Sequence, residues 1–230
     1  MRNPADSLTQ ILQRLRAAQV ARAEIAGTTV RLLAVSKTRT AAEVRALATL
    51  HQSAFGENYV QEAVAKQREL ADLDLEWHLI GHLQSNKARE TAVTFGWVQT
   101  VDRAKLVDAL ARHRPASMPP LNVLIQVNID DEASKSGCAP DAVDALADAI
   151  LAQPRLALRG LMAIPAPDPN MLRRRDAFRR MRELFDALHA RHPQVDTLSM
   201  GMSEDFELAI AEGATMVRVG TALFGPRLSA

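Results

Sequence analysis

The chain has 230 residues, of which 47% are hydrophobic, and its 28 basic and 27 acidic side chains give a net charge of +1. This composition is typical of a globular protein with a core, and the balanced charge provides no overall field that would attract nucleic acid or an anionic membrane. The only cysteine is Cys138 and no membrane-spanning or signal-peptide apolar stretch is present, so we expect a cytoplasmic protein without an intramolecular disulfide.

The N-terminal segment predicts an amphipathic helix over residues 7–25, because its apolar side chains fall mostly on one face. Residues 7–10 (SLTQ) match a capping box, in which the glutamine reaches back to the cap amide. We expect residues 1–27 to pack as an extra helix on a barrel, within a single domain that spans residues 1–230.

After Gly27, short apolar runs alternate with charged helical segments. The predicted strands are residues 30–35, 53–56, 76–80, 97–100, 122–128, 158–164, 197–200 and 216–219. The predicted helices between them are residues 41–50, 59–70, 85–95, 103–112, 140–152, 170–191 and 203–212. This alternation predicts an α/β fold of parallel βαβ units, and eight units fit a closed (β/α)8 TIM-type barrel. The alternative is an open doubly wound sheet, but the turn after the first strand, residues 36–39 (SKTR), lacks the usual glycines.

Polar residues at the C-terminal ends of the strands are the candidate site, because chemistry in such barrels takes place there. Lys37 follows the first strand, and Arg218, Gly220 and Thr221 come with the eighth. A glycine and a threonine that open a terminal helix are the usual barrel phosphate site, since backbone N–H groups there are free to donate. On its position alone Lys37 is an ordinary solvated lysine. Together, an amine, a phosphate site and an arginine are what pyridoxal 5'-phosphate (PLP) requires.

Seven stretches, in order along nearly the whole chain, resemble successive motifs of the pyridoxal phosphate homeostasis proteins. They are residues 34–38 (AVSKT), 56–62 (GENYVQE), 77–87 (WHLIGHLQSNK), 134–137 (SKSG), 162–165 (MAIP), 198–205 (LSMGMSED) and 217–225 (VRVGTALFG). One departure is His82, at a position where we expect a proline or another residue.

The resemblance implies a single barrel like the N-terminal domain of alanine racemase, with PLP as its cofactor. The binding residues that it implies are Lys37, Asn58, Ser199, Met200, Ser203, Arg218, Gly220 and Thr221. Among these, Ser203, Gly220 and Thr221 hold the phosphate, with help from Ser199 and Met200.

The resemblance also implies that Lys37 holds PLP as a Schiff base, that Arg218 faces the pyridine nitrogen and that Asn58 lies near the ring. These roles agree with elementary electrostatics. A lysine beside an arginine and a bound cofactor loses its proton more readily, as Schiff-base formation requires. A permanently charged arginine beside the ring nitrogen opposes protonation of that nitrogen, which weakens the electron sink of the cofactor.

Several of these residues have plainer interpretations. Without its motif, Arg218 would be assigned to a salt bridge inside the barrel, and Tyr59 is predicted to be a packing residue. The spacing of His78 and His82 would suit a metal on a helix, but the apolar context predicts a strand running into a loop, so we expect no metal. Cys138 has no paired histidine motif nearby, which argues against a nucleophile. The arginines of residues 173–182 flank an apolar helix stripe and resemble a solvated helix face.

The resemblance implies a non-catalytic protein that stores, buffers or hands on PLP, with PLP-requiring apo-enzymes as recipients. The alternative is an amino-acid racemase or another PLP enzyme of the alanine racemase type. Racemisation needs an acid or base on each face of the substrate Cα, and in alanine racemase-like enzymes one of them comes from a second, β-rich domain. Because the chain ends at Ala230, we expect no such domain, which favours the carrier and leaves no catalytic residue. No interface pattern is visible, so we expect a monomer.

Overall fold

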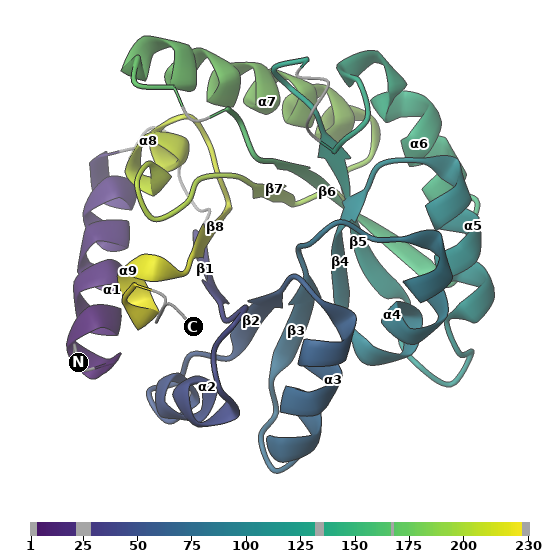
Figure 1. The fold of residues 1–230 in the computed structure, drawn as a ribbon. Helices are drawn as coiled ribbons and strands as arrows, with labels where there is room; N and C mark the ends of the chain where they lie inside the picture. Colours follow the sequence, from purple (N-terminus) through teal and green to yellow (C-terminus); the bar gives the residue numbers. More distant parts are fainter. Residues whose placement is uncertain (1–3, 22–28, 132–135, 167, 227–230) are drawn as a thin grey trace.

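The structure is a computed structural model that describes residues 4–21, 29–131, 136–166 and 168–226. Its centre is a closed barrel of eight parallel strands, arranged in chain order with β1 paired to β8 (Figure 1). The strands are β1 (Arg31–Val35), β2 (Ala54–Glu57), β3 (Glu76–Leu79), β4 (Trp97–Val101), β5 (Leu121–Val127), β6 (Leu156–Ala163), β7 (Thr197–Ser199) and β8 (Met216–Val219). Every predicted strand is present, and the (β/α)8 fold is confirmed.

Helices surround the barrel on its outside (Figure 1). They are α2 (Ala41–Ala48), α3 (Val60–Glu69), α4 (Ala88–Thr94), α5 (Ala104–His113), α6 (Val143–Leu151), α7 (Met171–Arg191), α8 (Phe206–Ala211) and α9 (Thr221–Phe224). Short 3-10 turns, η1 (Ser85–Lys87) and η2 (Pro140–Ala142), precede α4 and α6. Among the described residues, no helix is long and apolar enough to cross a membrane.

The predicted N-terminal helix is present as α1 (Pro4–Ala21), which lies beside α8 and α9 (Figure 1). The predicted capping box was wrong, because the helix begins at Pro4 and Ser7 is buried inside it. Residues 22–27 of the predicted helical segment lie outside the described residues. Arg14 fixes α1 to α8: it forms an ion pair with Glu207 at 2.6 Å, and its guanidinium lies 4.6 Å from the centre of the Phe206 ring.

The interior of the barrel is only partly apolar, because it also contains buried polar side chains. The main hydrophobic core fills the space between the strands and the surrounding helices. Inside the barrel two small separate clusters are present, one of Leu33, Ala54 and Met216 and the other of Trp97, Leu124 and Met162. Strands buried on both faces normally carry apolar side chains on both. The interior of this barrel instead includes buried histidine, glutamine, serine and arginine side chains.

Candidate functional site

A cavity of about 440 Å3 opens at the C-terminal ends of the strands, within the range of small-molecule sites. It is lined by Val35, Lys37, Asn58, Ile80, Ile164, Pro165, Arg174, Met202, Ser203, Glu204, Asp205, Arg218, Gly220 and Thr221. Six of the eight residues predicted to bind the cofactor are in this lining. The other two, Ser199 and Met200, are completely buried and are absent from it. The backbone N–H of Met200 donates to the carbonyl of Met216 at 3.1 Å.

Lys37 lies in a tight turn between β1 and α2. The Arg39 N–H donates to the Ser36 carbonyl at 3.0 Å, and Thr38 has a φ of 62°. A β-branched residue rarely adopts a positive φ, and such backbone persists only where neighbouring contacts hold it. One such contact is the Thr38 N–H, which donates to a carboxylate oxygen of Glu62 in α3. The turn therefore presents Lys37, which is half-buried, to the cavity.

A buried ion pair lies directly beneath this turn. The ammonium group of Lys66 donates to the Ser36 carbonyl at 2.6 Å and to carboxylate oxygens of Glu57 and Glu62 at 2.7 Å each. The Ser36 hydroxyl also donates to Glu57, at 2.6 Å. The Glu57 side chain is fully buried, and its second oxygen, Oε2, has no hydrogen-bond partner among the described residues. Burial raises the pKa of Glu57, although the hydrogen bonds from Lys66 and Ser36 oppose this shift.

Lys66 is the site residue that the sequence interpretation missed. It occupies the buried stripe of α3, in line with Val60 and Ala63. A lysine at an apolar helix position, four residues after Glu62, was the available signal, because a lysine is almost never buried without a partner.

Arg218 forms the floor of the cavity and is only 3% exposed. Its guanidinium donates to the Ser199 hydroxyl oxygen at 2.7 Å and to the Ala163 carbonyl at 2.8 Å. Among the described residues it forms no ion pair, so the salt-bridge interpretation does not hold for them. Burial lowers the pKa of Arg218 to about 10, which leaves the group charged at neutral pH. The floor therefore carries a positive charge that neutral oxygen atoms hold in place.

Another part of the cavity wall comes from the loops after β7 and β8. Ser203 is half-buried, Thr221 is exposed at the rim, and Gly220 precedes the first turn of α9. Asp205 also lines the cavity, but its Oδ1 atom accepts the Met202 N–H at 2.7 Å and so stabilises its own loop. This wall therefore offers two hydroxyl groups and a backbone without side-chain cover, which suits an anion.

Asn58, at the end of β2, is held by a close backbone approach. A Cβ atom at Gly81 would lie 2.2 Å from the Asn58 carbonyl oxygen, far inside any normal contact. Glycine at position 81 is therefore needed for the loop after β3 to pack on Asn58 at the cavity wall.

Three residues singled out in the sequence lie outside the lining. Tyr59 was predicted to be a packing residue, which was wrong, because it is 62% exposed. The imidazole of His82 lies 3.2 Å from the Ser136 hydroxyl and joins two rim loops. Cys138 is buried, and burial raises the pKa of its thiol to about 11, which disfavours the reactive thiolate. Ser134 and Lys135, from the fourth motif, lie outside the described residues.

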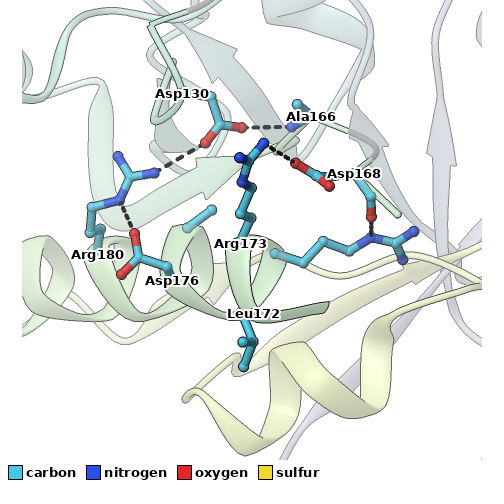
Figure 2. A pocket seen from close by; sticks show the side chains of 9 residues that line it. Asp130, Ala166, Asp168, Leu172, Arg173, Asp176 and Arg180 are labelled. Atoms are coloured by element: carbon cyan, nitrogen blue, oxygen red, sulfur yellow. Dashed lines mark hydrogen bonds and ion pairs between the residues drawn. The ribbon is translucent and has the colours of Figure 1, made fainter. Parts of the chain in front are cut away.

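A second pocket, of about 410 Å3, lies next to the cavity at the start of α7 (Figure 2). Figure 2 shows its arginines engaged with acidic residues of the same chain. Asp130 accepts the Ala166 N–H at 2.6 Å and a guanidinium N–H of Arg180 at 3.2 Å, and Arg173 pairs with Asp168 at 3.6 Å. These contacts secure the loop whose Pro165 lines the cavity. Two arginines of residues 173–182, Arg173 and Arg180, are therefore paired with acidic residues of the same chain.

Comparison with known proteins gives the family. The family model described as "Alanine racemase, N-terminal domain" matches residues 11–227. The pyridoxal phosphate homeostasis protein of Pseudomonas aeruginosa is 54% identical over 224 residues, with 97% of this chain and 95% of the relative covered. The protein of the same name from Escherichia coli strain K12 is 49% identical over 230 residues, with 99% and 98% covered.

The chain belongs to the pyridoxal phosphate homeostasis protein family. Among solved structures it is similar to PipY of Synechococcus elongatus PCC7942. The structure of PipY with PLP bound is 39% identical and has a TM-score of 0.78, with 92% of this chain and 100% of PipY covered. The structure of PipY without PLP is 38% identical and has a TM-score of 0.85, with 96% and 99% covered.

The buried Lys66–Glu57 pair predicts a pH-dependent stability defect in a Lys66→Met variant. The variant leaves the Glu57 carboxylate buried without its cation, a change that typically costs about 3–5 kcal/mol in the free energy of unfolding. Because the folded-state pKa of Glu57 is then well above its unfolded value, the folded state binds a proton more readily. The stability deficit is therefore largest at neutral pH and shrinks as the pH falls towards the unfolded pKa.

Urea unfolding at several pH values measures this deficit. Lys105→Met, at an exposed lysine of α5, is the matched control and should remain close to the parent protein. A Lys66→Met deficit below about 1 kcal/mol at neutral pH, or one that does not change with pH, would show that the pair does not matter.

Proposed function

We propose that the chain binds PLP in the cavity at the C-terminal end of the barrel and serves intracellular PLP homeostasis as a non-catalytic holder of the cofactor. In this proposal Lys37 forms a Schiff base with the aldehyde. The observation that carries it is the convergence, in one cavity, of a lysine amine, the buried charged Arg218 and the hydroxyl groups of Ser203 and Thr221. The names of the curated relatives and the PLP-bound structure of PipY support the same assignment.

The depths of these groups support an orientation for the cofactor. Arg218 is almost fully buried, whereas Ser203 is half-buried and Thr221 is exposed. A phosphate carries most of the charge of PLP and suits the wetter rim, where Ser203, Gly220 and Thr221 lie. The ring then points inward, with its nitrogen towards Arg218 and with Asn58 beside it. Ser199, which the family resemblance also implies, contributes from behind the lining by accepting a hydrogen bond from Arg218. We assign no direct cofactor contact to Met200, whose N–H is engaged with Met216.

The residues that line the cavity also favour a protein that holds PLP over an enzyme that uses it. PLP supplies an electrophilic aldehyde and an electron-withdrawing ring when it is bound. Turnover by racemisation needs a second acid or base opposite Lys37, and the described lining contains no histidine, tyrosine or cysteine. Its carboxylates are Glu204 and Asp205, of which Asp205 accepts the Met202 N–H. Arg218 keeps its charge at neutral pH and opposes protonation of the ring nitrogen.

The proposal extends to the cellular setting. We infer a cytoplasmic monomer, built as a single domain in which α1 packs on the barrel, that passes PLP to apo-enzymes requiring it. The exposed rim on which Thr221 lies supports such transfer, because the phosphate end of the cofactor is then reachable from solvent.

The phosphate assignment predicts weaker PLP binding in Thr221→Ala and Ser203→Ala. A hydrogen bond to a charged group contributes about 1.5–3 kcal/mol, so each substitution should weaken the affinity roughly tenfold or more. Absorbance or fluorescence titration with PLP measures the change. Ser117→Ala, at an exposed serine between α5 and β5, is the control and should bind like the parent. Unchanged affinity in both single variants and in the double variant would place the phosphate elsewhere.

The non-catalytic assignment predicts no deuterium exchange at the Cα of amino acids beyond that caused by free PLP. The PLP-loaded protein is incubated in D2O with a panel of L- and D-amino acids, and exchange is followed by proton NMR. Because the charged Arg218 opposes protonation of the ring nitrogen, the electron sink that would stabilise a carbanion at Cα is weak, and proton loss from Cα gains little from the protein. Exchange well above the free-PLP rate, lost in Lys37→Ala, would instead support the alternative, a racemase or related PLP enzyme.

A further inference from the structure

A continuous chain of hydrogen bonds crosses the barrel interior and ends on Arg218. It runs through five side chains: Arg218, Ser199, Gln99, His78 and Glu76. The successive distances are 2.7 Å from Arg218 to Ser199, 2.7 Å from Ser199 to Gln99, 2.9 Å from Gln99 to His78 and 2.7 Å from His78 to Glu76. We call this set the interior hydrogen-bond chain. It links strands β8, β7, β4 and β3 from the cavity floor to the N-terminal end of the barrel.

Every link in this chain donates in the same direction. Arg218 has only donors, so the Ser199 hydroxyl oxygen accepts from it and its proton goes to Oε1 of Gln99. The Gln99 amide nitrogen then donates to Nδ1 of His78, which leaves the proton of the imidazole on Nε2, facing Glu76. Burial lowers the pKa of His78, so a neutral ring with this one tautomer is expected.

The interior hydrogen-bond chain ends at the Glu76 carboxylate, which can only accept hydrogen bonds when it is ionised. Besides His78, the Glu76 carboxylate accepts hydrogen bonds from Arg31 and from the Trp97 indole N–H, the latter at 2.9 Å. Burial raises the pKa of Glu76, but the hydrogen bond from His78 and the charge of Arg31 outweigh it and hold the pKa well below its usual range. The carboxylate is therefore ionised at neutral pH and fixes the direction of the chain.

The apolar contents of the barrel support the middle of the chain from both sides. The His78 ring stacks on Trp97, a member of one interior cluster, with ring centres 5.0 Å apart. The Gln99 amide lies 3.2 Å from the sulfur of Met216, a member of the other cluster. His78, Gln99 and Ser199 are each fully buried, so no water competes for these bonds in the packed interior.

We propose that Gln99 and His78 are positioning residues for Arg218, holding its guanidinium at the cavity floor through Ser199. This rests on the proposed function only in so far as Arg218 contacts the cofactor. Without Gln99 the Ser199 proton loses the acceptor that fixes the rotation of the hydroxyl, so the oxygen is held towards Arg218 by one contact instead of two. The remaining described anchor, the Ala163 carbonyl, fixes one nitrogen but not the plane of the group.

The test uses the ligand-free protein and PLP titration together. In the parent, nitrogen-15 NMR should show His78 as the Nε2–H tautomer and discrete guanidinium N–H signals for Arg218. Gln99→Met should broaden or average the Arg218 signals and weaken PLP binding roughly tenfold or more. Gln126→Met is the matched control, because Gln126 is also a buried glutamine of a barrel strand but donates to the Ser136 carbonyl instead. It should leave the Arg218 signals unchanged.

The outcomes separate the two proposals. An Nδ1–H tautomer for His78, or Arg218 signals unaffected in Gln99→Met, would overturn the positioning role. If Gln99→Met does not fold, Ser199→Ala takes its place, and unaltered Arg218 signals in that variant would overturn the role equally. If the parent binds no PLP, the proposed function fails, and the ligand-free Arg218 signals still decide whether the chain positions this group.

Discussion

The site depends on one buried positive charge, which forms no ion pair among the described residues although the charge of Asp205 favours it. Arg218 is held by a hydroxyl and a carbonyl oxygen, and the nearest carboxylate in its hydrogen-bonded connections is Glu76, four links away. A buried cation is costly unless an anion or a dense set of acceptors compensates it. In the proposed function the ring nitrogen of the cofactor lies at the cavity floor and supplies a further acceptor. On that proposal the same guanidinium attracts the cofactor and opposes protonation of its ring nitrogen, so binding and weak activation have one physical origin.

The amine is positioned by a different set of contacts, in the turn that follows the neighbouring strand β1. The turn that presents Lys37 rests on the Lys66–Glu57 pair, which ties the end of β1 to the end of β2 and to α3. Lys66 donates to the backbone of Ser36, so a buried contact holds the turn in addition to the exposed one between Thr38 and Glu62. The two halves of the site therefore rest on two separate buried polar systems, one beneath Lys37 and one beneath Arg218.

The strands and the fold class were predictable from the sequence, since each strand is a compact apolar run and the runs alternate with helical segments. Lys37, Arg218, Gly220 and Thr221 were likewise accessible, because in this fold residues at strand ends converge wherever they lie in the chain. The exposure of Tyr59 was not predictable, since the neighbouring loop decides whether a residue at the start of a helix is packed or exposed. The interior hydrogen-bond chain was also out of reach. Gln99 and Ser199 are 100 residues apart, and only the closure and register of the barrel bring their side chains together.

The central claim is that Lys37 is the amine that holds PLP, and borohydride reduction tests it most directly. The protein is incubated with PLP, reduced, digested and mapped by mass spectrometry, with Lys37→Arg treated in parallel. The account predicts a single pyridoxyl adduct on the peptide containing Lys37 and none at the corresponding peptide of the variant. An adduct mapped to Lys87 or another lysine, or equal labelling of the variant, would contradict it.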